Sequence, residues 1–262
     1  MSQSAGRNPL LLAGFVIFFT LLLGLAAFGL NRIVNPPPEA VTVPCPSAPS
    51  GHPKDNARHT YTLPPGSKLD TTKGYTAVIC TTRGVIKVGL REIEAPTTVK
   101  DFVFLVNNGY YDGLTFHRVC PNTTDPSCGN NVIHIAQGGD PKGDGTGRGP
   151  GFLIPDEKPK GGYSTGTVAL ARPSNADGSK IPNSSGGQFF INTATNNFAP
   201  DYNLFGDVTS GMAVAQKLSK GDKIFWMAIE TRQLPAPSPG GASPSPGSTS
   251  PSPPSNPSPS PS

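Results

Sequence analysis

Hydrophobic and polar residues alternate along much of the chain between residues 73 and 233, and this pattern predicts β-strands. The run YTAVICTTRGVIKVGL, residues 75–90, consists of two β-rich segments around a Thr-Arg-Gly turn, which is typical of a hairpin. Further short strands are predicted at residues 114–119, 132–140, 166–171, 186–193 and 223–230. We therefore expect a mainly β domain.

Two segments follow the helical period instead. In residues 95–111, Val99, Phe102 and Val106 recur at helical spacing after an early proline, and Asn-Asn-Gly ends the pattern. Residues 210–222 show a second amphipathic helix pattern. Short strands, two helices and glycine-rich connections together predict an antiparallel β-barrel with helical caps.

The N-terminal region departs from this pattern. Residues 9–30 form a stretch of 22 residues without a charge, long enough to cross a bilayer as a helix. We interpret the stretch as an uncleaved membrane anchor that follows a short segment, residues 1–8. A cleaved signal sequence is the alternative, because small residues lie near the end of the stretch. The flanking charges are too balanced to orient the chain.

Proline-rich segments flank the predicted domain. Residues 31–72 are Pro-rich and poorly periodic, which is typical of a linker, and the domain itself is predicted over residues 73–233. Residues 234–262 are rich in proline and serine and lack any charge or aromatic ring. Such a composition buries too little apolar surface to order itself, so we expect a disordered tail reaching at most about 90 Å.

The four cysteines are Cys45, Cys80, Cys120 and Cys128, and the sequence leaves their pairing open. We favour Cys120 with Cys128, because they bracket a turn-rich loop whose closure would stabilise by about 2.5 kcal/mol in the chain-entropy model. Cys45 is a candidate tether within the linker. An even count on an anchored chain suggests an oxidising compartment. We therefore expect a single-pass cell-membrane protein with its domain outside the cytoplasm.

Several other chemistries find little support. A formal net charge of +4 without a basic stripe argues against nucleic-acid binding. The glycine-rich stretch 143–151 lacks the Gly-Lys-Ser/Thr of a P-loop, and Pro150 disfavours a following helix, so we interpret it as a tight loop. No cysteine or histidine pair stands at zinc-ligand spacing, and no Gly-x-Ser-x-Gly elbow indicates a hydrolase. We expect no metal and no cofactor.

One short run, LTFHRV at residues 114–119, places a charge on an apolar stripe. If the run is extended, Leu114, Phe116 and Arg118 share one face. The simplest interpretation is a surface strand end whose arginine stem covers Phe116. The motifs around the run suggest a more specific role for the arginine.

Several motifs occur together and in order: EAPTTVKDFVFLVNNGYYDGLTFHRV, AQGGDP, GTVALAR, SSGGQFFIN and LFGDVTSGM. In this form they resemble the cyclophilins, the peptidyl-prolyl cis/trans isomerases, over residues 75–230. The resemblance does not extend to the anchor, the linker or the tail. It implies a closed eight-stranded antiparallel β-barrel capped by two α-helices, with the substrate groove on its outside.

The resemblance also implies roles for individual residues. Arg118 occupies the place of the family's catalytic arginine, and Gln137 that of its groove glutamine, so both are candidate catalytic residues. Phe190 matches the phenylalanine that floors the proline pocket, and Leu170 stands where a methionine is usual. These two are candidate substrate-binding residues.

Further groove positions are matched by Ala171 and Gln188, whereas three positions depart from the family pattern. His134 stands in place of a phenylalanine, Phe198 in place of a tryptophan, and Tyr202 in place of a histidine. All five are candidate substrate-binding residues. His134 and Tyr202 would make the proline pocket more polar, and the loss of the tryptophan implies weaker cyclosporin binding. Two insertions also distinguish the chain, one after residue 118 and one in residues 173–185.

We therefore expect an isomerase that accelerates rotation about X-Pro bonds in proteins folding outside the cytoplasm, acting as a monomer on proline-containing polypeptides. Peptide planarity comes from resonance, and at the twisted transition state the prolyl nitrogen regains its lone pair. The guanidinium of Arg118 would donate to that lone pair, a contact absent from the ground state. The alternatives are a proline-peptide binding module with little or no turnover and a structural envelope protein whose tail spans the cell wall.

Overall fold

The computed structural model describes residues 44–53, 60–61, 66, 68–121, 128, 133–147 and 149–234. The predicted anchor, the segment before it and the proline-serine tail beyond residue 234 lie outside the described residues, as does much of the predicted linker. Within the part of the chain that the structure describes, no helix is both long enough and apolar enough to span a bilayer.

The domain begins with the hairpin that the pattern predicts. Strand β1 (Lys73–Thr81) pairs antiparallel with β2 (Gly84–Leu90) around a two-residue turn. Strand β2 alternates strictly between buried and half-buried residues, so Ile86, Val88 and Leu90 face the core. Strand β8 (Ile224–Gln233) pairs with the other edge of β1 along its whole length. The first and last strands of the domain are therefore neighbours.

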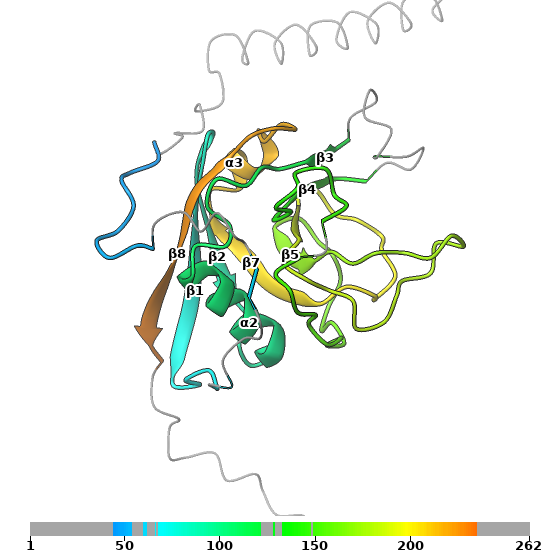
Figure 1. Cartoon of the computed structure of the whole chain (residues 1–262), viewed down its shortest axis with the longest axis horizontal. Helices are drawn as coiled ribbons and strands as arrows, with labels where there is room; N and C mark the ends of the chain where they lie inside the picture. Colours follow the sequence, from blue (N-terminus) through cyan, green and yellow to red (C-terminus); the bar gives the residue numbers. More distant parts are fainter. Residues whose placement is uncertain are drawn as a thin grey trace, which may run out of the picture.

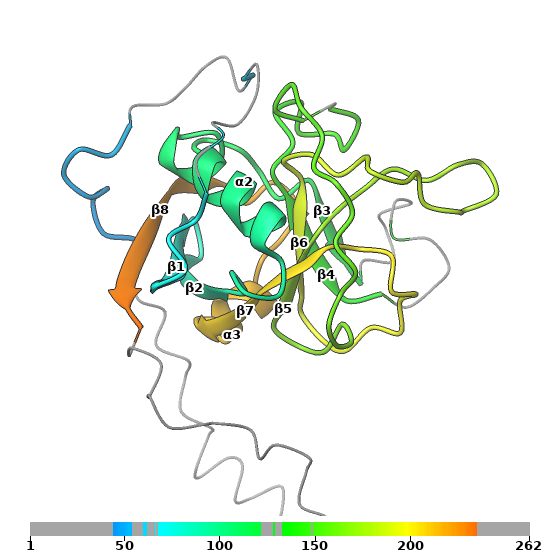
Figure 2. The same cartoon turned by 90° about the horizontal axis from the view of Figure 1, so that it is seen from below.

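Eight antiparallel strands form one strongly curled sheet in the order β3-β4-β6-β5-β7-β2-β1-β8 (Figures 1 and 2). The remaining strands are β3 (Arg118–Cys120), β4 (Ile135–Gly138), β5 (Thr167–Leu170), β6 (Phe189–Asn192) and β7 (Leu204–Ser210). The mainly β architecture with eight antiparallel strands and two helices is thereby confirmed. Strand β7 was not among the segments that the hydrophobic pattern marked as strands.

The predicted closure of the barrel is only partial in the described residues. The two edge strands, β3 and β8, share no ladder. The segment just before β3 joins the start of β8 instead, through a bridge between Thr115 and Lys223 and a 2.8 Å bond from the Ile224 N–H to the Leu114 carbonyl. The sheet is therefore a curled sheet pinned at one corner rather than a barrel with a continuous ladder.

Helices α2 (Pro96–Asn107) and α3 (Met212–Gln216) lie at opposite ends of the curled sheet (Figure 1). Helix α2 ends at the Asn-Asn-Gly signal, as predicted, and Gly109 then takes a positive φ of 69°. Helix α3 is shorter than the predicted segment, because residues 219–222 form a turn in which the Asp222 carboxylate accepts the Ser219 N–H at 2.7 Å.

Apolar side chains fill the inside of the curled sheet. Phe102 of α2 sits at the centre, with its ring 4.8 Å from that of Phe205 and 5.3 Å from that of Tyr111. A second, smaller apolar cluster lies on the outer side of the sheet and includes Phe190 and Leu204. Most of the hydrophobic surface is therefore in one core, and the outer cluster marks a different kind of surface.

Both pairs of cysteines form disulfides. Cys120 and Cys128 pair as predicted, with their Cα atoms 5.7 Å apart. Cys45 pairs with Cys80 of β1, with a Cα separation of 5.4 Å. Part of the predicted linker is thus bound to the domain: residues 44–53, here called the N-terminal strap, lie against β1 and β8. The Trp226 indole donates to the Pro46 carbonyl at 3.1 Å.

Candidate functional site

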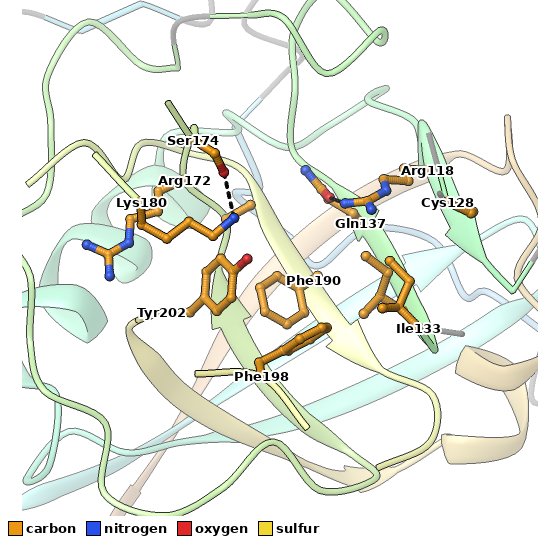
Figure 3. A pocket seen from close by; sticks show the side chains of 12 residues that line it. Arg118, Cys128, Ile133, Gln137, Arg172, Ser174, Lys180, Phe190, Phe198 and Tyr202 are labelled. Carbon is orange, nitrogen blue, oxygen red and sulfur yellow. Dashed lines mark hydrogen bonds between the residues drawn. The ribbon is translucent and has the colours of Figure 1, made fainter. Parts of the chain in front are cut away.

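A cavity of about 360 Å³ opens on the outer face of β3, β4 and β6 (Figure 3). Strand register places three side chains beside one another there, because Arg118 pairs with Gln137 across β3 and β4, and Gln137 pairs with Phe190 across β4 and β6. Cross-strand partners project from the same face of a sheet. Residues far apart in sequence thus form one row along the cavity.

Aromatic rings make the floor of this cavity. The ring of Phe190 lies 6.0 Å from that of Phe198 and 5.2 Å from that of Tyr202, both in edge-to-face orientation. Tyr163 supports them from behind, since its hydroxyl donates to the Tyr202 carbonyl at 3.0 Å and accepts the Tyr202 N–H at 2.9 Å. The floor is therefore aromatic, with the apolar rings of Phe190 and Phe198 at its centre and Tyr202 at its polar side.

A chain of hydrogen bonds holds the polar side of the cavity. Arg118 donates through one terminal nitrogen to the Gln137 side-chain oxygen at 3.3 Å. Gln137 in turn donates to the Gln188 side-chain oxygen at 3.0 Å, and Gln188 donates to the carbonyls of Gly145 and Gly147, each at 3.3 Å. The arginine is thus connected to the glycine-rich loop through two amides.

The glycine-rich loop owes its shape to one buried carboxylate. Asp140 accepts the backbone N–H groups of the loop at 2.6 to 3.3 Å, from Lys142, Asp144, Gly145 and Gly147. Any side chain at residue 147 would collide with this carboxylate. The stretch is a tight loop, as predicted, and its inward-facing N–H groups bind Asp140 instead of a phosphate.

Three basic side chains line the cavity, and its described lining residues include no carboxylate. Arg172 is turned aside and forms an ion pair with Asp156 at 2.6 Å. Arg118 and Lys180 lie on either side of Phe190 (Figure 3). The charged side chains among the described lining residues are thus all cationic.

His117, next to Arg118 in the chain, is only 6% exposed. Burial lowers the pKa of His117, and the neighbouring Arg118 cation lowers it further.

A second hollow of about 570 Å³ adjoins the first. Gln137, Ala171 and Arg172 line both, and Leu153 and Ile181 form exposed apolar parts of the second. The two hollows therefore make a continuous surface along the outside of the sheet. Among the described residues, no three His, Cys, Asp or Glu side chains are arranged to hold a metal ion.

The structure brings most of the candidate site residues together. The first hollow is lined by Arg118, Gln137, Ala171, Phe190, Phe198 and Tyr202. Gln188 lines the second hollow and binds Gln137.

Two candidates lie elsewhere. Leu170 is fully buried in the central core, whereas Ala171, directly after β5, lines the cavity. His134 lines neither hollow, and its backbone carbonyl accepts the Asn196 side-chain amide at 2.9 Å. Strand alternation explains both cases. Leu170 is next to Ala171, and His134 lies between Ile133 and Ile135; because these neighbours face the cavity, alternation turns both side chains away from it.

Six residues of the cavity were not predicted as site residues: Cys128, Ile133, Ile135, Arg172, Ser174 and Lys180. Period-two alternation from Gln137 could have identified Ile135 and Ile133, which share its strand face. The other four had no such signal. Arg172 follows β5, Ser174 and Lys180 belong to the insertion at residues 173–185, and Cys128 reaches the cavity through its disulfide with Cys120.

Comparison with known proteins adds independent information. The family model described as "cyclophilin type peptidyl-prolyl cis-trans isomerase/CLD" matches residues 76–231. The "probable peptidyl-prolyl cis-trans isomerase B" of Mycobacterium tuberculosis is 34% identical over 174 residues, which are 63% of this chain and 54% of the relative. The chain thus spans about half the length of that relative.

Two further matches cover nearly whole proteins. The "peptidyl-prolyl cis-trans isomerase" of Synechococcus elongatus is 34% identical over 158 residues, covering 59% of this chain and 96% of the relative. The crystal structure of a Cryptosporidium parvum cyclophilin type peptidyl-prolyl cis-trans isomerase matches with a TM-score of 0.50 and 25% identity, covering 60% of this chain and 98% of that one. Together with the curled sheet and the arginine beside an aromatic floor, these matches show that the chain belongs to the cyclophilin type peptidyl-prolyl cis-trans isomerase family.

Proposed function

We propose that this protein is a peptidyl-prolyl cis/trans isomerase that accelerates rotation about X-Pro bonds. The observation that carries the proposal is the row of Arg118, Gln137 and Phe190 across three adjacent strands. It sets a cation and an amide beside an apolar floor within one cavity of about 360 Å³. The Synechococcus relative, almost all of which is matched, is named as an isomerase.

Rotation of an X-Pro bond needs little from a protein beyond this arrangement. Its barrier of about 18–20 kcal/mol comes from amide resonance, and the two isomers are close in energy. When the bond twists, the carbonyl loses polarity and the prolyl nitrogen regains its lone pair. An apolar floor of Phe190 and Phe198 disfavours the planar, polar amide relative to that state. The reaction breaks no bond and needs no nucleophile.

Arg118 would supply the contact that exists only in the transition state. A guanidinium donor to the prolyl nitrogen is a charge-assisted hydrogen bond, worth about 1.5–3 kcal/mol, or about ten- to a hundredfold in rate. Gln137 holds one terminal nitrogen of the guanidinium at 3.3 Å and so limits its rotation. Arginine suits this role better than lysine, since it stays charged and presents its donors in a rigid fork.

Substitution of Arg118 tests the proposal. We expect Arg118→Ala to lower the exchange rate of an Ala-Pro peptide by about ten- to a hundredfold and Arg118→Lys to recover only part of that loss. Two-dimensional NMR exchange measurements on the peptide with the full chain in mild detergent give the rate without a coupled protease. Arg232→Ala, which removes an exposed arginine of β8, is the matched control. Equal rates for wild type and Arg118→Ala would exclude the proposed role.

A binding module with little turnover is the second candidate. Tyr202 and Lys180 make one wall of the cavity polar, which favours retention of a bound peptide over rotation within it. The same NMR samples discriminate between the two. Peptide shifts that titrate to saturation without faster exchange would support the module, whereas faster exchange at catalytic protein concentration supports the enzyme.

We further propose that the enzyme acts outside the cytoplasm as a monomer anchored by residues 9–30. The uncharged length of that stretch and the two disulfides, Cys45–Cys80 and Cys120–Cys128, support this location. Digestion of intact spheroplasts by an added protease tests the orientation: a protected domain would contradict it.

A further inference from the structure

The insertion at residues 173–185 contains a small hairpin beside the cavity. Ser174 and Lys180 form an isolated antiparallel β-bridge, and the Ile181 N–H donates to the Pro173 carbonyl at 3.2 Å. At its tip, the Asp177 carboxylate accepts the Ser179 N–H at 2.9 Å and the Ser179 hydroxyl at 2.6 Å. The hairpin is therefore ordered by its own hydrogen bonds, and its base adjoins the cavity.

The hairpin places one cation over the aromatic floor. The Lys180 ammonium lies 5.1 Å from the centroid of the Tyr202 ring and donates to the Ser174 hydroxyl at 2.6 Å (Figure 3). An ammonium has three donors, and Ser174 accepts only one of these hydrogen bonds. Lys180 is also half-buried, so its stem is held in place while its charge faces the cavity.

The charges around the cavity are not balanced within it. Arg172 already forms an ion pair with Asp156, whereas the hydrogen-bond partner of Lys180 is the neutral Ser174. With Arg118 on the other side of Phe190, two cations face a cavity whose described lining contains no carboxylate. A ligand that carries a negative charge would meet complementary potential there.

We propose that Lys180 is a specificity-determining residue, which selects X-Pro segments that carry a carboxylate side chain within two residues of the proline. The inference rests on the proposed function, because it takes the proline ring to lie on Phe190. A proline seated there leaves its neighbouring residues to pass between Arg118 and Lys180. An aspartate or glutamate at one of those positions receives a charge-assisted hydrogen bond from the lysine.

The experiment compares peptides that differ in one charge. A set of Ala-Pro peptides carries either Glu or Gln at the position directly before the dipeptide or at one of the two positions after it. NMR measures affinity and exchange rate for each peptide with the full chain. At one or more positions we expect the Glu peptide to have an affinity or kcat/KM about two- to fivefold higher than its Gln partner at low salt. The preference should shrink with added NaCl, because salt screens partly exposed charges.

Substitutions of Lys180 assign the preference to this residue. We expect Lys180→Met to bring the Glu-to-Gln ratio close to one, because the Glu peptides lose more affinity and kcat/KM than the Gln peptides do. Lys180→Glu should bring the Glu-to-Gln ratio below one, because the new carboxylate repels the Glu peptide. Lys217→Glu, which makes the same charge change at an exposed lysine outside both hollows, should leave the ratio unchanged.

Failure of this inference is distinguishable from failure of the isomerase proposal. Accelerated exchange with equal rates for the Glu and Gln peptides at every position would overturn the role of Lys180 alone. A preference that persists in Lys180→Met would assign it to Arg118 and also overturn the inference. If the chain accelerates no exchange, the isomerase proposal fails, and the Glu-to-Gln affinity ratio in wild type and Lys180→Met still tests the role of Lys180.

Discussion

Arg118 faces the cavity because the chain changes face just before β3. Leu114 and Phe116 point into the core, and regular alternation would send Arg118 there as well. The ladder with β4 starts only at Arg118, and from that point Val119 faces the core instead. The backbone between Phe116 and Arg118 thus departs from an extended strand, which turns the guanidinium outward toward Gln137.

The residue in between, His117, makes stability depend on pH. Neither of its ring nitrogens has a hydrogen-bond partner among the described residues, and burial lowers its pKa below the usual value of about 6.5. At a pH between the folded and the unfolded pKa of His117, the unfolded chain binds more protons than the folded chain. The contribution of the neutral His117 to stability is therefore complete above about pH 6.5 and declines as the pH falls toward the folded pKa.

We expect His117→Phe to reduce this pH dependence. Urea unfolding at pH 7 and pH 5 should show that wild type loses more free energy of unfolding over this interval than the variant does. The difference between the two proteins isolates this histidine from carboxylates such as Asp101, whose pKa burial raises. Equal losses in the two proteins would contradict the assignment.

At the scale of elements, helix α2 is capped from a distant loop. Ala95 at its N-cap offers no side-chain acceptor, and Pro96 follows. The Glu157 carboxylate instead accepts the N–H groups of Thr97 and Thr98, at 3.0 and 2.7 Å. Asn203 holds that loop, because its side-chain oxygen accepts the Glu157 N–H at 3.2 Å. The first turn of the helix is thus tied to the loop before β5 and, through that loop, to Asn203 just before β7.

Removing this remote cap should destabilise the domain. We expect Glu157→Ala to lower the free energy of unfolding by about 1–2 kcal/mol, since two helix N-terminal donors lose a charged acceptor. Glu157→Gln should cost less, because its amide keeps one oxygen acceptor. Glu230→Gln, which breaks an exposed ion pair with Lys87, is the control and should cost under about 1 kcal/mol in the same denaturant series. A Glu157 variant as stable as this control would refute the capping role.

Elements with strong local periodicity were predictable, and those defined by distant contacts were not. The β1–β2 hairpin and α2 follow from their own sequences. Strand β7 does not alternate: Leu204, Phe205 and Gly206 are all buried, and a side chain at Gly206 would collide with Val88. Its pattern therefore reflects packing on both faces rather than a period of two.

The candidate site shows the same division. Family motifs identified Arg118, Gln137 and Phe190, which the strand register then brings together. They also included Leu170, because a motif does not record which face of a strand a residue occupies. Lys180 lies in an insertion, so neither periodicity nor the motifs pointed to it. Its position depends on the hairpin bonds around Ser174.

At the scale of the whole molecule, the N-terminal strap is fastened at three points. Cys45 is joined to Cys80, Trp226 binds the Pro46 carbonyl, and His52 contacts the Asp112 carboxylate at 2.6 Å. The other Asp112 oxygen accepts the Met227 N–H of β8 at 3.1 Å. Figure 1 shows the strap beside β8, on the opposite side of the molecule from β3 and β4.

Stability and catalysis should therefore separate at the strap. The Cys45–Cys80 disulfide spans 35 residues and is worth about 4 kcal/mol in the chain-entropy model, against about 2.5 kcal/mol for the 8-residue span of Cys120–Cys128. We expect the double variant Cys45→Ala/Cys80→Ala to lose the larger amount in denaturant unfolding and to keep wild-type exchange rates under native conditions. The double variant Cys120→Ala/Cys128→Ala should lose less stability but change those rates, because Cys128 lines the cavity. The opposite ranking would contradict this division.

The Cys45–Cys80 disulfide also determines the effect of backbone cleavage on this protein. A protease that cuts anywhere between Cys45 and Cys80 yields two polypeptides that remain one covalent molecule, because the bond bridges the cut. Such a nicked protein would migrate unchanged on a non-reducing gel and would separate into two bands only after a thiol is added. After a cut within this segment, release of the domain from whatever precedes residue 45 therefore requires a reductant as well as the protease.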